Sequence, residues 1–377
     1  MTIAEARARV PFLDLRGTTD AVADAVVADW LALMQSGAFI GGEPVMAFER
    51  QLATYCGTSH AVGMANGTDA LHLTLRALGI GPGDSVVVPA NTFVATVEAI
   101  ALAGATPRFA DVDPDTLLLT ADAVAAATLP STKAVIVVHL YGQMPDMDAI
   151  AECASRHGLL VIEDAAQAQG ASFAGRRAGS LGVAGCFSFY PGKNLGAFGD
   201  AGAVVTSDPV LAERLLSLRD HGRAAGTHHD HVVLGTNSRL DAVQAVVLSA
   251  KLPHLDAWNK ARRDLMALYR ELLDPTRALP VAEQRGGLGV HHLAVVRVAD
   301  RDRVRRELDD HGIATGIHYP VPCHRMQPYR SHADGALPVA ERTAEELLSL
   351  PMYPHLEPDD VRHVAQIVNR LADRRRS

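Results

Sequence analysis

The feature of this 377-residue chain that most constrains its fold is a repeated alternation of short apolar segments with helical segments. The helical segment 68–78, for example, closes at Gly79, as helices often do. Repeated strand–helix–strand units predict a mostly parallel sheet that is covered by helices on both faces, and therefore an α/β fold. The expected strands are residues 61–64, 85–88, 107–110, 134–139, 159–162 and 203–206, and the helices include residues 21–34, 44–56, 68–78, 92–103, 146–158 and 239–251.

The last third of the chain predicts a second, smaller domain. A chain of this length is too long for one small core and suits a large domain with a smaller companion. We place the boundary near Leu255, so that residues 1–254 form the large domain, which begins with a helical segment, and residues 255–377 form a small C-terminal α/β domain. Its expected elements are helices over 258–273, 301–311, 339–348 and 358–372 and strands over 290–298 and 314–319.

Composition and charge exclude several classes of function. The net charge of -8 leaves no general basic field for nucleic acid or an anionic membrane. The 4 cysteines are scattered without a CxxC pair, which predicts neither a zinc site nor a disulfide framework. The N-terminal segment lacks an apolar stretch long enough for a signal peptide, and later apolar runs are interrupted by Pro, Gly or acidic residues. We expect a cytoplasmic protein that binds neither nucleic acid nor membrane.

Lys193 is the first candidate for chemistry. It is the only charged residue in the segment 178–199, AGSLGVAGCFSFYPGKNLGAFG. An apolar environment favours the neutral amine, which is the nucleophile that forms Schiff bases with aldehydes. A lysine whose stem packs on the surface while its amino group reaches water is the alternative. A phosphate-binding P-loop is excluded, because Phe187 and Asn194 occupy the positions that need Gly and Ser or Thr.

Asp164 and Gln167 are candidates because Asp164 ends the apolar segment LLVIED. The carboxyl ends of parallel strands are where α/β proteins hold their ligands. A carboxylate at this edge could keep a proton on a ring nitrogen, although a helix N-cap or a turn explains the same residue. Gln167 could bind either a ligand or the backbone.

A phosphate site is predicted where Gly67 and Thr68 open a helix, because free backbone N–H groups and the helix dipole suit an anion. Ordinary N-capping explains these residues equally well. Ser188 is a second phosphate donor or a buried serine bonded to the backbone. The HHDH segment 228–231 is not expected to bind metal, since consecutive loop residues seldom converge on one ion. Neither a GxSxG nor a GxGxxG motif is present after a strand.

Together these segments resemble the DegT/DnrJ/StrS family of pyridoxal-phosphate-dependent sugar aminotransferases. The resemblance runs from about Val10 to Leu371, and the order of the segments makes it specific. In order they are GAFIGGEPVMAFE, ANGTDALHL, PANTFVAT, VHLYGQ, VIEDAAQAQG, FSFYPGKNLGAFGDAG, GTNSRLDAVQA and HYPVPCHRMQPY.

The resemblance implies a fold-type-I transferase with a large mixed sheet, a small C-terminal domain and a homodimer whose active sites lie at the interface. Pyridoxal 5'-phosphate is the implied cofactor, with pyridoxamine 5'-phosphate in the half-reaction. Lys193 would form the internal aldimine, Asp164 would pair with the ring nitrogen and Gln167 would contact the ring hydroxyl. The remaining implied cofactor contacts are Phe93 on the ring face, Gly67, Thr68 and Ser188 on the phosphate, and Asn237 of the partner subunit on the phosphate.

The expected substrates are L-glutamate and a nucleotide-diphosphate-linked keto-sugar. Aromatic faces and cations on segments that we expect to border the cleft suit a base and a diphosphate. A polar rim of a subunit interface would explain the same residues. The histidine-containing segment before GTNSR resembles members that act on 3-keto rather than 4-keto sugars. The predicted substrate-binding residues are Phe39, His229, Tyr319, His324 and Arg325.

Three other functions are compatible with parts of this pattern. A sugar 3-dehydrase of the same family has histidine at the lysine position, so Lys193 argues against it. A non-catalytic regulatory protein need not keep both Lys193 and Asp164. An aminotransferase for a cyclitol ketone of the scyllo-inosose type would have the same cofactor motifs.

Overall fold

The computed structural model describes residues 9–373 and contains a seven-stranded sheet with the order β1-β9-β8-β5-β4-β2-β3. Strand β9 runs antiparallel to both of its neighbours, β1 and β8, whereas the pairs from β8 through β5, β4 and β2 to β3 are parallel. This confirms the predicted mixed, mostly parallel sheet. Its strands are β1 (His60–Met64), β2 (Ser85–Pro89), β3 (Thr106–Ala110), β4 (Thr132–Val138), β5 (Leu160–Asp164), β8 (Ala184–Ser188) and β9 (Gly202–Thr206).

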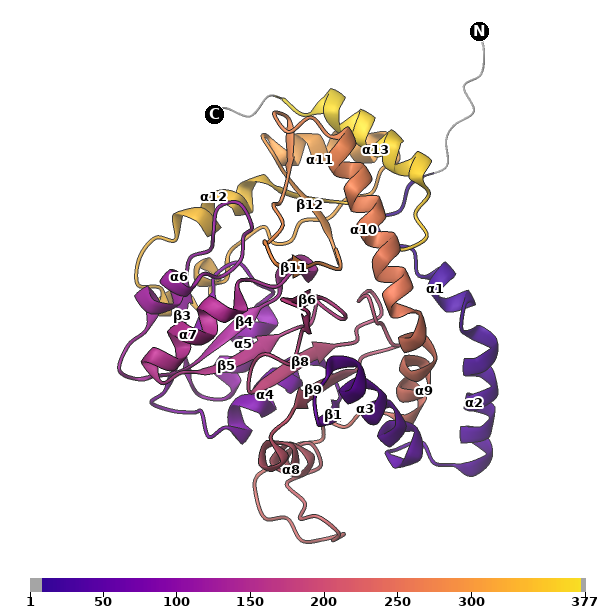
Figure 1. Ribbon diagram of the computed structural model, residues 1–377, viewed down its shortest axis with the longest axis vertical. Helices are drawn as coiled ribbons and strands as arrows, with labels where there is room; N and C mark the ends of the chain where they lie inside the picture. The colour runs from indigo at the N-terminus through magenta and orange to yellow at the C-terminus, as the bar shows by residue number, and fades with distance from the viewer. Residues whose placement is uncertain (1–8, 374–377) are drawn as a thin grey trace.

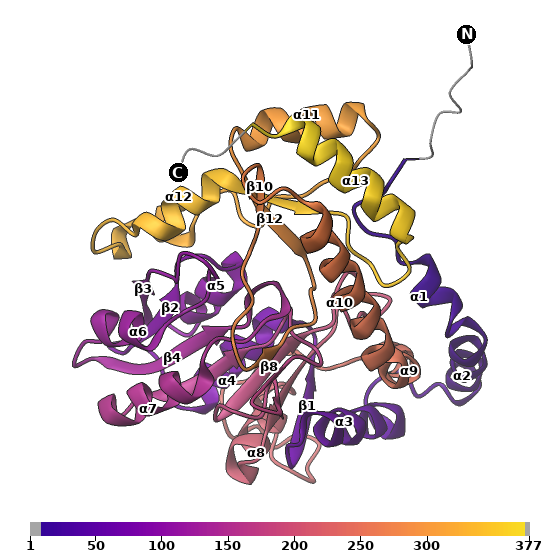
Figure 2. The same ribbon diagram turned by 45° about the horizontal axis from the view of Figure 1, so that its top comes forward.

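Helices cover both faces of this sheet (Figures 1 and 2). Val135 and Val137 of β4 point into the core on one face, and Ile136 between them points into the core on the other. The first face is covered by α3 (Gly42–Cys56), α6 (Ala121–Ala127), α7 (Met147–His157) and α9 (Ala242–Lys251), and the second by α4 (Gly67–Ala77), α5 (Val94–Leu102) and α8 (Pro209–Leu218). Two N-terminal helices, α1 (Arg16–Asp20) and α2 (Ala23–Ser36), lie outside them, with α2 beside α9.

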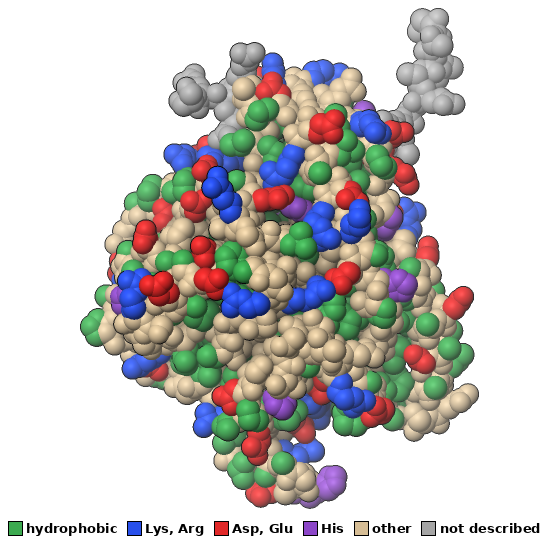
Figure 3. Space-filling model, viewed as in Figure 1, with side chains coloured by type: hydrophobic (Ala, Val, Ile, Leu, Met, Phe, Trp, Pro, Cys, Tyr) green, Lys and Arg blue, Asp and Glu red, His purple; other side chains and the backbone are tan. Residues whose placement is uncertain are grey.

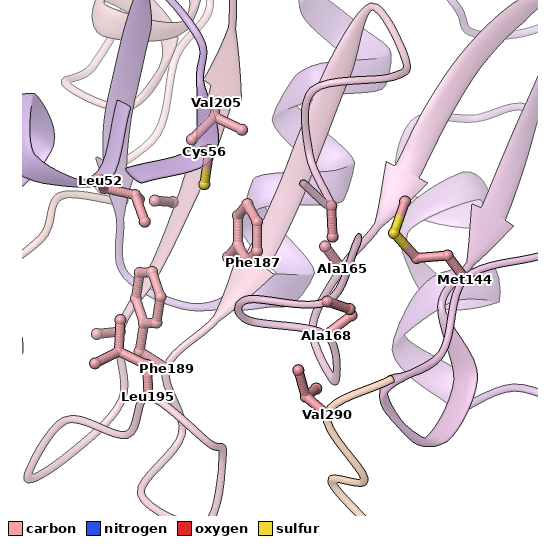
Figure 4. Packing of buried hydrophobic residues seen from close by; sticks show 14 of the residues in the cluster. Leu52, Cys56, Met144, Ala165, Ala168, Phe187, Phe189, Leu195, Val205 and Val290 are labelled. Carbon is pink, nitrogen blue, oxygen red and sulfur yellow. The ribbon is translucent and has the colours of Figure 1, made fainter. Parts of the chain in front are cut away.

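Aromatic side chains from β8 and the segment after it fill part of the first core, which is the core on the face covered by α3, α6, α7 and α9. The rings of Phe187 and Phe189 are parallel, with centroids 6.3 Å apart, and Phe48 of α3 meets Phe189 edge-on at 5.4 Å. Figure 4 shows Leu52 and Leu195 packed around the same rings. The strand that leads to Lys193 is therefore anchored in a dense apolar core, which keeps the following loop in a defined position.

The C-terminal part contains a three-stranded antiparallel sheet of order β10-β12-β13 and a third core (Figure 2). Its strands are β10 (Ala278–Pro280), β12 (Ala294–Val298) and β13 (Leu347–Leu350), and its helices are α10 (Leu255–Leu272), α11 (Arg301–Asp310), α12 (Pro338–Glu346) and α13 (Pro358–Leu371). Leu255 packs in the first core, whereas Met266 of the same helix packs in the third. Val10 also packs in the third core, so the two ends of the described chain meet there. The domain boundary near Leu255 stays a prediction.

Three predicted elements differ from the structure. The expected strand 290–298 is shorter, because its pairing with β13 begins only at Ala294, the first residue of β12. The expected helix 339–348 ends earlier, because residues 347–350 are fully buried and pair with β12 as strand β13. An apolar run fits either element in sequence, and its backbone partner decides. The expected strand 314–319 is irregular, with Gly316 alone bridging to Ser349. Three short strands, β6 (Ser172–Phe173), β7 (Arg176–Arg177) and β11 (Gly287–Leu288), form a separate small sheet that was not predicted.

The segment 222–235 is a long loop, as predicted, and it projects from the body of the molecule beyond α8 (Figure 1). Its last apolar residues are exposed, and Leu234 exposes 83% of its surface. Histidine lies at the tip of this projection (Figure 3). No helix within residues 9–373 is long and apolar enough to cross a membrane.

Candidate active site

A cavity of about 450 Å³ lies at the carboxyl ends of the parallel strands, between the large sheet and the C-terminal part. The carboxyl ends of β4, β5 and β8 and the first residues of α4 and α5 form its floor. A larger cavity of about 990 Å³ lies between α8 and the loop 222–235 and contains none of the predicted catalytic residues. The predicted site residues that line the smaller cavity together are Gly67, Thr68, Phe93, Asp164, Gln167, Ser188, Lys193 and Tyr319.

Lys193 reaches this cavity from a tight loop after β8. Its backbone N–H donates to the carbonyl oxygen of Tyr190 at 2.8 Å, and Ala197 N–H returns to the carbonyl oxygen of Phe189 at 2.8 Å. Burial lowers the pKa of Lys193 from 10.5 to about 8, and the opposing charge of Asp164 limits this decrease. A substantial fraction of the amine is therefore neutral near pH 8, as a nucleophile or general base requires.

Asp164 lies buried at the end of β5 with both carboxylate oxygens hydrogen-bonded. Thr96 Oγ1 donates to Oδ2 at 2.8 Å, and the backbone N–H of Ala166 donates to Oδ1 at 3.2 Å. Burial raises the pKa of Asp164, and these two hydrogen bonds and the charges of Lys193 and His139 oppose the increase. A cation placed in the cavity beside this carboxylate would hold it ionised.

The first turn of α4 faces the cavity across from Ser188. The side chain of Asn66 caps the helix, because its Oδ1 accepts from the backbone N–H of Asp69 at 2.8 Å. The backbone N–H groups of Gly67 and Thr68 are not capped by Asn66. A Cβ on Gly67 would lie 2.7 Å from Cβ of Ser188, so only glycine lets the helix start approach the serine so closely. These groups suit a bound phosphate.

Gln167 connects the end of the large sheet to Tyr319 in the C-terminal part of the chain. Its Oε1 accepts from the backbone N–H of Tyr141 at 2.7 Å, and its Nε2 donates to the hydroxyl of Tyr319 at 2.9 Å. Within residues 9–373 the second N–H of Nε2 has no hydrogen-bond partner, so it can donate to a ligand. Phe93, which exposes 51% of its surface, and Tyr319 face each other with ring centroids 5.7 Å apart.

The structure does not bring the other predicted site residues to this cavity. Phe39, His229 and Asn237 are exposed and lie outside it. His324 is fully buried and bonded through Nε2 to Glu341 Oε1 at 2.9 Å. Arg325 donates to the same oxygen at 2.7 Å. In this chain these two side chains fix the segment that follows Tyr319, and their role in substrate binding stays a prediction.

Three residues that the sequence analysis did not single out also shape the cavity. His292 and His318 line it, and the hydroxyl of Tyr141 donates to the carbonyl oxygen of His318 at 2.5 Å. Tyr141 and His318 occur in the segments VHLYGQ and HYPV, whereas His292 precedes β12 with no motif around it. Only the tertiary fold brings His292 to the site.

The cavity fits pyridoxal phosphate in its chemistry. A buried carboxylate is opposite in charge to a protonated ring nitrogen, and a helix N-terminus with a serine offers donors to a phosphate. The Lys193 amine of lowered pKa in the same cavity can bind an aldehyde. Within residues 9–373, no group of His, Cys, Asp and Glu side chains is arranged to hold a metal ion.

Comparison with known proteins agrees with this chemistry. The dTDP-3-amino-3,4,6-trideoxy-alpha-D-glucose transaminase of Streptomyces venezuelae is 47% identical over 373 residues, which cover 97% of each protein. The UDP-N-acetyl-3-dehydro-alpha-D-glucosamine 3-aminotransferase of Acidithiobacillus ferrooxidans is 46% identical over 362 residues, which cover 96% of this chain and 97% of that protein.

A solved structure shares the whole fold. The crystal structure of S. venezuelae DesV in complex with a ketimine intermediate matches with a TM-score of 0.94 and 45% identity, covering 98% of this chain and 100% of that one. A family model described as the DegT/DnrJ/EryC1/StrS aminotransferase family matches residues 21–369. The chain therefore belongs to the DegT/DnrJ/EryC1/StrS aminotransferase family and is a pyridoxal-phosphate-dependent aminotransferase.

Proposed function

We propose that this aminotransferase moves the amino group of L-glutamate to the ketone of a nucleotide-diphosphate-linked sugar, with a 3-keto sugar favoured over a 4-keto sugar. The observation that carries the proposal is the single cavity in which Lys193 and Asp164 lie with the facing rings of Phe93 and Tyr319. The names of both relatives place the amino group at carbon 3 of a sugar nucleotide. One relative is named for a dTDP sugar and the other for a UDP sugar. The two names therefore agree on carbon 3 as the aminated position but not on the nucleotide.

Lys193 and Asp164 divide the chemistry between them. When bound, pyridoxal phosphate withdraws electrons from the bond that breaks at the α-carbon of the amino donor. Lys193 Nζ would take the proton from that carbon as a general base and deliver it as a general acid to the other carbon bonded to the transferred nitrogen, for which a pKa of about 8 is well matched. Asp164 keeps the ring nitrogen protonated, because its carboxylate is buried and oriented by Thr96.

The other cavity residues would bind and orient the cofactor. The backbone N–H groups of Gly67 and Thr68 and the hydroxyl of Ser188 would bind the phosphate. Phe93 would contact the ring. The N–H of Gln167 that is not bonded to Tyr319 would donate to the ring hydroxyl. The same amide therefore positions both the cofactor and a side chain on the substrate side.

The substrate proposal predicts strong discrimination against a free cyclitol. If the diphosphate is bound as proposed, kcat/KM is expected to be at least about 10²-fold higher for a nucleotide-linked 3-keto sugar than for scyllo-inosose, because the free cyclitol would leave the groups that bind the diphosphate unpaired. A nucleotide-linked 4-keto sugar, measured alongside with L-glutamate as donor, tests the ring position. Efficient amination of scyllo-inosose with no turnover of any nucleotide sugar would contradict this substrate and leave the aminotransferase activity standing.

The active unit is proposed to be a homodimer in which each site contains residues of both subunits. Asn237 is exposed and does not line the cavity of its own chain, which supports a role in the site of a second copy. Phe39 and Ile40 are also exposed, and their backbone pairs with Ala242 and Asp241 at the start of α9, a few residues after Asn237 in the chain. Exposed apolar surface of this kind marks protein–protein contact. Exposed large apolar residues also occur in α2 and in the loop 222–235: Val27, Leu31 and Met34, and Val232, Val233 and Leu234.

Shared sites predict complementation between two inactive variants. Lys193→Ala removes the amine, and Asn237→Asp places a negative charge beside the bound phosphate. After mixing and subunit exchange, about a quarter of all sites should be intact, because half of the dimers are hybrids and each hybrid has one intact site. Activity of the mixture against that of each variant alone measures this. If exchange is verified by native mass spectrometry and no activity returns, Asn237 does not act across the interface.

A further inference from the structure

A chain of buried amide side chains connects the active-site loop to the C-terminal part of the molecule. Asn259 of α10 donates from Nδ2 to the carbonyl oxygen of Gln169 at 2.9 Å. Its Oδ1 accepts from Asn194 Nδ2 at 2.8 Å, and the same Nδ2 donates to the carbonyl oxygen of Val290 at 3.0 Å. Oδ1 of Asn194 lies 3.1 Å from Nδ1 of His292.

These contacts determine where the proton of His292 resides. Backbone carbonyl oxygens only accept, so each asparagine must turn its NH2 group toward Gln169 or Val290 and its oxygen the other way. Asn194 Oδ1 is then an acceptor, and Nδ1 of His292 must be the donor. A neutral imidazole with its proton on Nδ1 has a lone pair on Nε2. Within residues 9–373, no hydrogen bond involves this Nε2 atom.

The surroundings of His292 keep its ring neutral. His292 lines the cavity with Lys193 and His318, and Arg262 of α10 donates to its carbonyl oxygen at 3.4 Å. Burial, helped by the charges of Lys193, Arg262 and His318, lowers the pKa of His292 well below 6.5. His318 is also neutral near pH 7, since burial lowers its pKa to about 4. The charged groups that influence the ring are all cationic in their protonated forms, so none of them stabilises an imidazolium.

We propose that His292 is a positioning residue for the proton transfer: its Nε2, left without a partner among the described residues in the cavity that Lys193 also lines, accepts a hydrogen bond from the amino group of Lys193 as that group turns toward the substrate. The amide chain makes this possible by excluding the other tautomer, which would direct an N–H toward the ammonium. The proposal rests on the role of Lys193 in the proposed function and is independent of the identity of the sugar.

Two substitutions separate the two ring nitrogens of His292. Asparagine keeps an N–H near the place of Nδ1 and removes the acceptor at Nε2. Glutamine keeps an oxygen near the place of Nε2 and removes the donor to Asn194. If the acceptor matters, His292→Asn should slow the L-glutamate half-reaction by roughly 10- to 100-fold, and His292→Gln should recover most of that loss. The matched control is His291→Asn, because His291 has φ 41°, a backbone conformation that asparagine tolerates.

A second readout needs no amino donor or sugar. Only the neutral amine reacts with an aldehyde, so the rate at which cofactor-free enzyme captures pyridoxal phosphate should rise with pH and level off above the pKa of Lys193, about 8. An accepted hydrogen bond stabilises the ammonium, so its loss in His292→Asn should move this inflection to lower pH. His292→Gln should move it back. An inflection that stays in place in His292→Asn, or a shift in His292→Gln alone, overturns the proposal.

The tautomer itself can be observed directly. In protein labelled with ¹⁵N-histidine, the resonance pair that disappears in His292→Asn belongs to His292. It should show a protonated Nδ1 and a bare Nε2 between pH 6 and pH 9, with no titration across that interval. A proton on Nε2, or titration near the ordinary pKa of histidine, would refute the assigned role even if the enzyme proves to use the expected sugar.

Discussion

Replacing Lys193 by alanine is expected to lower the rate of transamination by at least about 10³-fold, because the nucleophile and the proton carrier disappear together. Lys193 is the only lysine that lines the cavity within residues 9–373, so no neighbouring amine can take its place. The rate of the L-glutamate half-reaction, followed by absorbance with the variant saturated in pyridoxal phosphate, measures this loss independently of the sugar substrate.

Lys193→Arg is the matched control for charge. Arginine keeps a cation on a long side chain but stays protonated at every accessible pH, so it can act neither as nucleophile nor as base. It should be as inactive as alanine. Borohydride reduction of the wild-type holoenzyme should leave the cofactor covalently on the peptide that contains Lys193 and on no other. Wild-type turnover in Lys193→Ala, or recovery in Lys193→Arg, would contradict the assignment.

The part of the site that could be predicted from sequence is the part that lies at strand ends. Asp164 is the last residue of the apolar strand β5, and Gly67 opens helix α4 shortly after strand β1. Because carboxyl ends of parallel strands share one edge of a sheet, these local patterns also place the residues near one another. Lys193 was predicted for a different reason. Burying a charge among apolar residues costs free energy, so an isolated lysine in an apolar segment indicates a specific role.

The part that could not be predicted depends on contacts between distant segments. The ring of His292 is oriented by Asn194, which is oriented in turn by Asn259 and the carbonyl oxygen of Gln169, and these residues are separated by up to 123 positions. Their sequence neighbourhoods contain no shared pattern. In the sequence, Asn194 and Asn259 look like ordinary polar residues. Only the structure shows that both are buried and that their hydrogen bonds fix the orientation of each amide.

The strand β8 and the irregular backbone of residues 314–319 also could not be predicted from local sequence patterns. The run 184–188 becomes β8 because its backbone pairs with β5 on one side and β9 on the other. The segment 314–319 is apolar enough for a strand, yet Tyr141 and Gln167 bond to it through the carbonyl of His318 and the hydroxyl of Tyr319. Hydrogen bonds to side chains replace the ladder that a strand would need.

Replacing Asp164 by asparagine is expected to separate cofactor binding from catalysis. Asparagine keeps the size of the side chain and can still hydrogen-bond to the ring nitrogen, so pyridoxal phosphate should bind with an affinity within about tenfold of the wild type. It removes the buried negative charge that keeps that nitrogen protonated. The L-glutamate half-reaction at saturating cofactor should therefore slow by roughly 10²- to 10³-fold, the usual effect of removing one preorganised electrostatic group.

Thr96→Val is the control that leaves the charge of Asp164 in place. It removes the hydroxyl that donates to Oδ2 at 2.8 Å and keeps the shape of the side chain. Without that donor the pKa of Asp164 should rise further, because burial already raises it and one opposing hydrogen bond is gone. The half-reaction should slow much less than in Asp164→Asn, since the protonated ring nitrogen still keeps the carboxylate ionised. If Asp164→Asn instead binds cofactor poorly but reacts at the normal rate once saturated, Asp164 holds the ring without tuning its electrons.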